Sequence, residues 1–273
     1  MKQLTCRFGI LCAGLLCFSM PLVAIAAGEA GTVMNVNGAV TAKGADGTLK
    51  VLAPKATVFS GDNLFTGKES YARIKFIDGA EIILRSNSNF KVENYNFDEK
   101  EPAKDSAGFN LLKGSLRALS GSIGKRGDPD SYGIKTPTAT AGIRGTAFGL
   151  LFCKGDCSEV PTPTGTPPED GLHVDVEQGT VILKNGGGSL LLNAGQYGYV
   201  KDNNVVPATV PPEKAVPITL PPHVSAQHAQ SVKQEQKEKA ATSTKQEQKA
   251  APSGDGVEVT PETSGSGKEC PAR

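Results

Sequence analysis

The sequence contains no tryptophan, only three histidines and almost no net charge over its 273 residues. A formal charge of +1 lacks the basic excess that nucleic-acid-binding proteins usually carry, so we expect no nucleic acid partner. Three histidines leave few general bases or metal ligands, and the sequence has no Gly-x-Ser-x-Gly elbow of a hydrolase. We therefore expect a protein that is not an enzyme, with no catalytic residues, no metal and no cofactor.

Glycine, in contrast, is abundant: the chain has 32, against a usual share of about 7%. Between residues 28 and 200, short runs of alternating apolar and polar residues are separated by glycine-marked turns, and no long amphipathic helix is evident. This pattern predicts an all-β fold, either twisted β-helix-like or sandwich-like. After an alternating run at residues 72–76, further strands are predicted over Ser115–Leu119, Tyr132–Lys135, Ala147–Phe152, Leu172–Val176, Thr180–Leu183, Leu190–Leu192 and Tyr197–Val200.

Asp78-Gly79 predicts a turn after the first alternating run. A two-residue loop would place Phe76 and Ile82 on opposite faces of the hairpin. A wider or bulged loop aligns the apolar faces instead and would pair Phe76 with Ile82, so we expect such a hairpin or the corner of a coil.

A weak internal repeat combines a polar residue, a glycine, a small residue and an aliphatic residue. It occurs at Asn37–Val40, Lys113–Leu116 and Gln178–Val181. Each glycine can turn the chain and direct the aliphatic side chain inward. The unequal spacing argues against a strict solenoid repeat and suits a β-helix-like or sandwich core with unequal coils.

The first 26 residues have the composition of a secretory signal peptide. Lys2 and Arg7 precede an uncharged apolar stretch, and Ala24-Ile25-Ala26 has the small-x-small pattern of a cleavage site. An uncleaved membrane anchor is the alternative, but Pro21 and the cleavage pattern favour removal of residues 1–26. We therefore expect a periplasmic protein, with the cell surface as the alternative, and no transmembrane span after cleavage.

Three cysteines remain after such cleavage: Cys153, Cys157 and Cys270. The first two flank the turn-forming residues 154–156, so a local disulfide is favoured in an oxidising compartment. Two free thiols, or a metal site formed with His173, are the alternatives. Cys270 has no evident partner.

Residues 201–273 contain no aromatic side chain, and six prolines crowd between residues 207 and 222. Such a segment buries too little apolar surface to offset the entropy of ordering it. We therefore expect a β domain over residues 27–200, followed by a disordered tail over residues 201–273. A tether that contacts the cell wall or a partner is the alternative role of the tail.

Three segments of the predicted β domain resemble the FecR domain family. They are residues 61–82, with Gly61-Asp62, Thr66-Gly67 and Phe76-Ile77-Asp78-Gly79; residues 113–117; and residues 136–148, with Thr136-Pro137 and Arg144-Gly145-Thr146. The resemblance extends over about residues 31–200. It implies an all-β fold, which in sensor members of the family is similar to a twisted β-helix.

The family includes transmembrane regulators that pass a signal from an outer-membrane transporter to a cytoplasmic sigma factor. This sequence departs from that plan, because we expect neither an N-terminal cytoplasmic domain nor a lasting membrane span. The resemblance therefore implies a non-enzymatic, exported binding or signalling-accessory module that contacts an unknown envelope protein or cell-wall component. A structural envelope or surface protein that attaches through its tail is the alternative function.

The residues of the family motifs are more typical of turns than of ligand sites, although contact with a partner stays open. They are Gly61, Asp62, Thr66, Gly67, Asp78, Gly79, Gly114, Thr136, Pro137, Arg144, Gly145 and Thr146. Residues 153–171 are predicted to form a long loop held by the disulfide, and this loop is our first candidate for a contact surface. His173, Asp175 and Glu177 fall on one strand face, where an exposed polar surface is favoured over a metal or acid–base site.

Residues 113–144 carry six basic side chains against two acidic ones. Such an excess could meet an anionic surface such as a glycan or a lipid headgroup. Solvated strand faces are the favoured interpretation.

Overall fold

The computed structural model describes residues 28–126 and 130–220, together with residues 225, 226, 230, 233 and 237. The predicted signal peptide, residues 1–26, lies outside the described residues, as does most of the predicted tail. Every strand of the described chain belongs to a compact unit that ends at Ile218. No helix among the described residues has the length and hydropathy needed to cross a lipid bilayer.

The fold is all-β, as predicted, and the described residues up to 220 form strands linked by turns and two short 3-10 helices. In chain order the elements are β1 (Glu29–Asn37), β2 (Val40–Lys43), β3 (Leu49–Val51), β4 (Thr57–Phe59), β5 (Asn63–Thr66), β6 (Tyr71–Phe76), β7 (Glu81–Leu84), β8 (Asn89–Asn96), η1 (Pro102–Lys104), β9 (Ser106–Leu119), β10 (Tyr132–Lys135), β11 (Thr140–Cys153), β12 (Gly171–Asn185), β13 (Gly188–Asn193), β14 (Tyr197–Val200), β15 (Ala208–Val210) and η2 (Pro212–Lys214).

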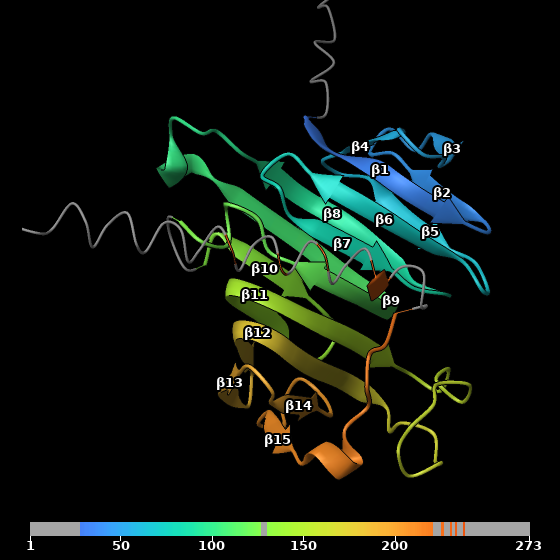
Figure 1. Cartoon of the computed structure of the whole chain (residues 1–273), viewed down its shortest axis with the longest axis vertical. Helices are drawn as coiled ribbons and strands as arrows, with labels where there is room; N and C mark the ends of the chain where they lie inside the picture. The colour runs from blue at the N-terminus through green and yellow to red at the C-terminus, as the bar shows by residue number, and fades with distance from the viewer. Residues whose placement is uncertain are drawn as a thin grey trace, which may run out of the picture. The chain divides into compact units, whose positions relative to one another are not determined.

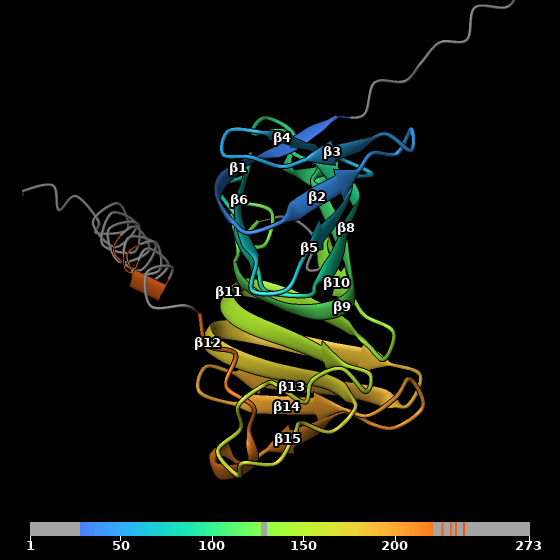
Figure 2. The ribbon, with the colours of Figure 1, turned by 90° about the vertical axis from the view of Figure 1, so that its right-hand side faces the viewer.

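These strands belong to one sheet, which bends so that two halves face each other (Figure 1 and Figure 2). One half contains β4, β1, β6 and β7, and the other contains β3, β2, β5 and β8. The long strands β9, β11 and β12 contribute to both halves, because each pairs with different neighbours before and after a bend. Most pairs are antiparallel, whereas β9 and β10 run parallel.

Glycines form the bends of the long strands. Gly114 in β9, Gly145 in β11 and Gly179 in β12 have positive φ angles of 81°, 58° and 79°. A Cβ atom on Gly114 would lie 2.6 Å from the Cα atom of Ser88, and one on Gly179 would lie 2.3 Å from the carbonyl oxygen of Gly145. Both the backbone conformation and the lack of space therefore require glycine at these bends.

The hydrophobic core lies between the two halves of the sheet. The aliphatic residues of the predicted repeat, Val40, Leu116 and Val181, are at most 1% exposed, so they point inward as expected. The ring of Phe109 stands at the centre, with centroid distances of 5.2 to 6.5 Å to four other rings, those of Phe76, Phe90, Tyr95 and Tyr132. Removing these large apolar surfaces from water stabilises the bent sheet.

The hairpin between β6 and β7 has the wide loop that the sequence predicts. Ile74 pairs with Ile82, and the backbone N–H of Phe76 donates to the carbonyl oxygen of Ala80 at 2.8 Å. The apolar faces therefore agree, but the expected pairing of Phe76 with Ile82 was wrong by two residues. The prediction identified the face of each side chain correctly and the cross-strand partner incorrectly, because alternation fixes only the face.

Ordered structure continues beyond residue 200, where the sequence places the start of the tail. β15 pairs with β14, and after it the segment of residues 211–218, here called the strap, passes over the outer surface of the sheet (Figure 1). Ile218 is 1% exposed and packs with Leu151 and Val216. A Cβ atom on Gly149 would lie 2.9 Å from the Cβ atom of Ile218. The strap can therefore pack against β11 at this position because Gly149 has no side chain.

Candidate functional site: a pocket under the disulfide loop

Asp62 and Gly61 form the turn between β4 and β5. The Asp62 side chain is buried and accepts hydrogen bonds from the backbone N–H of Phe59 at 3.0 Å and from Lys50 Nζ at 2.9 Å. Gly61 has a φ of 90°. These are the contacts of a turn, and the carboxylate faces the protein instead of an open site.

Asp78 anchors the β6–β7 turn to two other segments. Its Oδ1 accepts a hydrogen bond from Tyr95 Oη at 2.8 Å, and its Oδ2 accepts one from the backbone N–H of Ile123 at 3.2 Å. Burial and the neighbouring Asp78 raise the pKa of Tyr95, so the phenol stays protonated and can donate to the carboxylate. Gly79, with a φ of 86°, completes the turn at the surface.

Thr66 and Gly67 connect β5 to the chain reversal between β7 and β8. The Thr66 hydroxyl donates to the carbonyl oxygen of Arg85 and accepts from the backbone N–H of Ser88. Ser88 Oγ in turn accepts from the backbone N–H of Ser115, next to the Gly114 bend, at 3.0 Å. The two family segments thus meet at one edge of the fold and stabilise the same bend.

The third family segment forms the β10–β11 turn and the bend of β11. Thr136 closes the turn around Pro137 by donating from its backbone and its hydroxyl to the carbonyl oxygen of Ala139. At the bend, Thr146 is fully buried, and its hydroxyl donates to the carbonyl oxygen of Thr180 at 2.9 Å. Arg144 is different, because its side chain is exposed and its guanidinium has no partner in the described part of the chain.

The motif residues therefore lie at separate turns and bends instead of forming one cluster. Their hydrogen bonds are those of structural residues. A role in contacting a partner stays a prediction for these residues. Arg144 is the best candidate among them, because its side chain is exposed.

Cys153 and Cys157 form a disulfide, as predicted, with an S–S distance of 2.06 Å. The bridge uses both thiols, so neither is available to a metal ion. The described residues contain no group of three or more His, Cys, Asp or Glu side chains that could hold a metal. The disulfide fixes the start of the loop of residues 153–171, which we call the disulfide loop.

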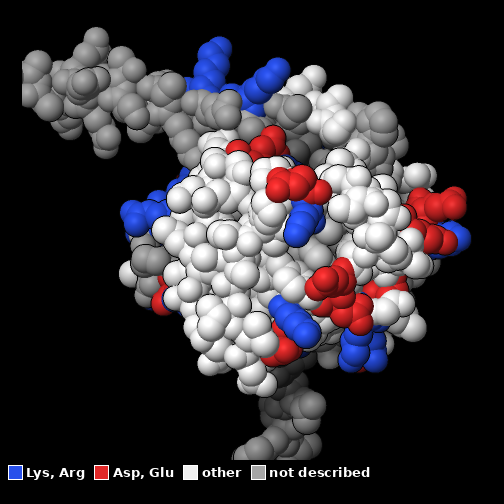
Figure 3. Space-filling model, turned by 90° about the horizontal axis from the view of Figure 1, so that it is seen from below, with Lys and Arg blue, Asp and Glu red and all other residues white. Residues whose placement is uncertain are grey.

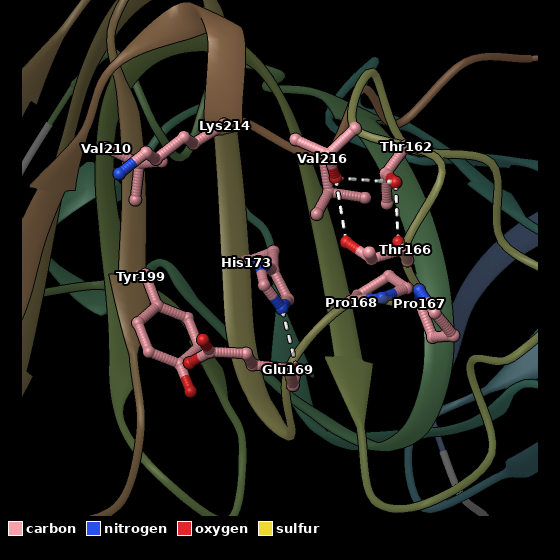
Figure 4. A pocket seen from close by; sticks show the side chains of 11 residues that line it. Thr162, Thr166, Pro167, Pro168, Glu169, His173, Tyr199, Val210, Lys214 and Val216 are labelled. Atoms are coloured by element: carbon pink, nitrogen blue, oxygen red, sulfur yellow. Dashed lines mark hydrogen bonds between the residues drawn. The ribbon is translucent and has the colours of Figure 1, made fainter.

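A pocket of about 300 Å³ opens between the disulfide loop and the outer surface of the sheet (Figure 4). Its wall combines the far end of the loop, strands β12, β14 and β15, and the strap. The lining residues are Thr162, Thr164, Thr166, Pro167, Pro168, Glu169, His173, Tyr199, Val210, Lys214 and Val216. The loop that the sequence singles out as a contact surface is thus one side of this pocket.

His173 forms the floor of the pocket. Its Nε2 atom lies 2.9 Å from the carbonyl oxygen of Glu169, and its ring centroid lies 4.9 Å from that of Tyr199. Burial lowers the pKa of His173 below its ordinary value, although Glu169 partly opposes the shift. The imidazole is therefore neutral at pH 7 and donates its Nε2–H to the loop backbone.

Tyr199 and Lys214 provide the other polar groups. Burial, with Glu169 nearby, raises the pKa of Tyr199 to about 12, and its hydroxyl donates to the carbonyl oxygen of Asp170. Lys214 is exposed and has no ion-pair partner within the described residues. The pocket thus offers a cation, a carboxylate, threonine hydroxyls and an aromatic ring, which suits a polar ligand better than a purely apolar one.

Asp175 and Glu177 do not line the pocket with His173, and both bind the same arginine. Arg117 Nη1 donates to Asp175 Oδ2 at 2.8 Å, and Arg117 Nη2 donates to Glu177 Oε2 at 2.6 Å. Arg117 also donates to the carbonyl oxygen of Ile218, at 3.2 Å. The expectation of an exposed strand face was therefore wrong for His173 and Asp175, whereas Glu177 is exposed as expected.

The basic side chains of residues 113–144 do not gather into one anion-binding surface. Arg117 binds Asp175, Arg126 binds Asp105 at 3.0 Å, and Lys113 lies 3.2 Å from Asp156. Seen from the β15 end, the surface shows scattered charges of both signs around a broad uncharged area (Figure 3). The local charge excess is thus largely neutralised within the fold.

Sequence reasoning missed the pocket residues that follow residue 200: Val210, Lys214 and Val216. The signal was present, because Val210, Val216 and Ile218 are aliphatic residues within a proline-rich segment. Prolines at positions 211, 212 and 217 restrict the chain and lower the entropy that it loses on docking.

The comparisons with known proteins agree with the sequence resemblance. A family model described as FecR protein matches residues 62–182. No curated protein matches the chain.

Several solved structures share limited similarity with the chain. Two crystal structures of a "putative anti-sigma factor" from Parabacteroides distasonis ATCC 8503 have 12% and 13% identity and TM-scores of 0.39 and 0.40. Each alignment covers 54% of this chain and 58% of the other, so the chain spans little more than half of their length. A "cell surface anchoring domain" has 26% identity over 22% of this chain and 80% of its own, with a TM-score of 0.22. On the family match, the chain carries a FecR domain over residues 62–182.

Proposed function

We propose that the protein is a non-enzymatic, exported FecR-like module of the periplasm that acts in binding or signalling through contacts with an envelope protein or cell-wall component. The contact surface in this proposal is the pocket under the disulfide loop. The observation that carries it is the loop itself: a disulfide and a rigid sheet hold residues 153–171 over a pocket of about 300 Å³. Loops on a rigid scaffold commonly carry binding function.

The lining of the pocket offers groups that can bind a polar ligand. The ring nitrogen Nε2 of His173 is bonded to the Glu169 carbonyl, which ties the imidazole to the loop backbone. Glu169 and Lys214 can pair with opposite charges on a polar ligand, while Tyr199 offers an aromatic wall. A peptide segment with both donors and acceptors fits this arrangement.

Crosslinking in intact cells tests the proposed contact surface. The full chain is compared with Lys214→Glu, which reverses the pocket's cation, and with Lys201→Glu, an exposed control at the same end of the sheet. We expect the main crosslinked complex to decrease severalfold for Lys214→Glu and to remain for Lys201→Glu. Equal yields from all three chains would contradict the proposal.

A chain that ends at Leu220 separates this function from attachment through the tail. It retains the pocket and the strap, so we expect it to form the same complex. If the complex disappears while the shortened chain stays folded, attachment through the tail explains the contact and the pocket proposal is wrong.

Export is tested independently by fractionating the cells and sequencing the N-terminus of the mature protein. We expect the protein in the periplasmic fraction, beginning at Ala27. A cytoplasmic protein with residues 1–26 intact would contradict the proposed location.

A further inference from the structure

A second pocket, of about 190 Å³, lies on the same outer surface at the other end of the disulfide loop. Its polar side is formed by the chain reversal after β7 and the bend of β9, and its apolar side by β11 and the loop. The lining residues are Arg85, Ser86, Asn87, Gly114, Ser115, Leu151, Asp156, Cys157, Glu159, Val160 and Pro161. This volume is below that of most pockets for whole small molecules and suits a group the size of one side chain.

Arg85 sets the chemistry of this pocket. Its side chain is half-buried, yet its guanidinium forms no hydrogen bond or ion pair within the described residues. Arg73 and Arg117 on the same surface are each bound to carboxylates, at 2.7 and 2.8 Å. Arg85 is thus a partly desolvated cation whose five N–H donors are unused, and such a group gains most from a carboxylate that accepts two parallel hydrogen bonds.

Ser115 and Asn87 add unused polar groups beside Arg85. Ser115 is 5% exposed, and its hydrogen bonds to other described residues all involve its backbone, so its hydroxyl is free to donate. The Asn87 side chain is exposed at the pocket edge and has no partner among the described residues. The hydroxyl and the guanidinium line the same small space, so one oxyanion can meet both.

The acidic residues of the pocket favour a singly charged ligand. Asp156 lies 3.2 Å from Lys113 Nζ, and Glu159 lies 3.6 Å from Lys68 Nζ, so their charges are largely balanced. A phosphate dianion would still meet two carboxylates close by, which opposes its binding. Leu151 and Val160 supply an apolar wall for the carbon atoms that carry a carboxylate.

We propose that the Arg85 pocket binds the carboxylate of a peptide, either a Glu or Asp side chain or a free C-terminus. The inference rests on the proposed function in one respect: it names the chemistry of a protein partner that would contact the same surface. The two can fail separately, because the pocket is tested with peptides in solution and the proposed function is tested by crosslinking in cells.

The experiment follows the Arg85 Nε–H signal and the backbone amides of residues 85–87 and 115 of the full chain by NMR. Four probes are titrated: acetyl-Gly-Glu-Gly-amide, acetyl-Gly-Gly-Ala with a free C-terminus, acetyl-Gly-Gln-Gly-amide and inorganic phosphate. We expect saturable shifts with at least one of the two carboxylates, weaker shifts with phosphate and none with the glutamine peptide. The comparison of the first two probes tells which source of carboxylate the site prefers.

Substitutions then locate the binding. Arg85→Gln should weaken carboxylate binding by about 10- to 100-fold, because charge-assisted hydrogen bonds are lost. Ser115→Ala should weaken it by about 2- to 10-fold, whereas Lys135→Gln, an exposed cation on β10, should have no effect. If Arg85→Gln does not fold, Arg85→Lys can replace it. Lysine keeps the positive charge but lacks the paired N–H donors of the guanidinium, so this variant should bind the carboxylate less tightly than the unaltered protein does.

Three results would overturn the assignment. They are shifts from both carboxylate probes that do not exceed those from the glutamine peptide, tighter binding of phosphate than of either carboxylate, and an unchanged affinity for carboxylate in a folded Arg85 variant. The first two use the unaltered protein and do not depend on the stability of any variant.

Discussion

The bends of the sheet are stabilised in a different way from the two segments that cover its outer surface, the disulfide loop and the strap. At the bends, a few glycines and short polar side chains meet backbone atoms at close range, as Gly114 does with Ser88. The cover consists of the disulfide loop and the strap, and it depends on a small apolar cluster around Leu151 and Ile218. The comparison teaches that short motifs encode the framework, whereas the candidate binding surface depends on contacts between distant segments.

The largest expected effect is at a bend. Gly114→Ala adds a Cβ atom 2.6 Å from the Ser88 Cα atom at a φ of 81°, so we expect the free energy of unfolding to fall by about 2–5 kcal/mol. Gly79→Ala is the matched control, because Gly79 has a φ of 86° and no atom within 4 Å of the added Cβ. It should cost only about 1–2 kcal/mol. Urea unfolding of both variants checks this, and equal losses would show that crowding at the bend is unimportant.

The next effect tests the strap. Ile218→Ala removes buried aliphatic surface from the cluster with Leu151 and should cost about 2–3 kcal/mol. We expect the loss to appear as local opening, with faster amide hydrogen exchange near residue 215 and little change at the core strands. Faster exchange throughout the sheet would mean that the cover and the bent sheet unfold together as one cooperative unit.

The disulfide has a comparable or smaller effect. Cys153→Ser together with Cys157→Ser should lower the free energy of unfolding by about 2 kcal/mol, because the bridge closes only a short loop. The all-β circular dichroism spectrum should persist. Complete unfolding of the double variant under native conditions would show that the bent sheet itself, and not only its cover, depends on the disulfide.

The smallest effect is the pH dependence of His173. Its folded-state pKa lies below the ordinary value of 6.5, so as the pH falls the unfolded chain takes up the proton first. The stability contributed by the neutral imidazole is present above about pH 6.5 and is lost as the pH falls below that value. We expect the wild type to lose more stability than His173→Gln between pH 7 and pH 5, measured by urea unfolding. Parallel pH profiles would contradict this assignment.

The sequence predicts the framework because its determinants are local. A positive φ requires glycine, and alternation requires apolar residues on one face, so Gly114 and Gly179 mark bends and Leu116 and Val181 point inward. The Cys153–Cys157 bridge is predicted for the same reason, since its cysteines are close in the chain.

The candidate site is less predictable because it joins distant segments. Arg117 binds Asp175, 58 residues later in the chain, and periodicity assigns the face of each residue without naming its partner. The strap resembles a linker by composition, because only two large aliphatic anchors, Val216 and Ile218, lie among prolines and charges. Its docking is decided by the space over Gly149, which no local pattern reveals.

The sharing of β9, β11 and β12 between the two halves of the sheet also bears on how the molecule unfolds. Neither half has a complete set of strands without the other, because these three strands pair with neighbours in both halves. We therefore expect the bent sheet to unfold in a single cooperative transition instead of as two independently stable pieces. Mechanical force on one half of the sheet, or a proteolytic cut in it, should therefore destabilise the other half, because the three long strands continue through both.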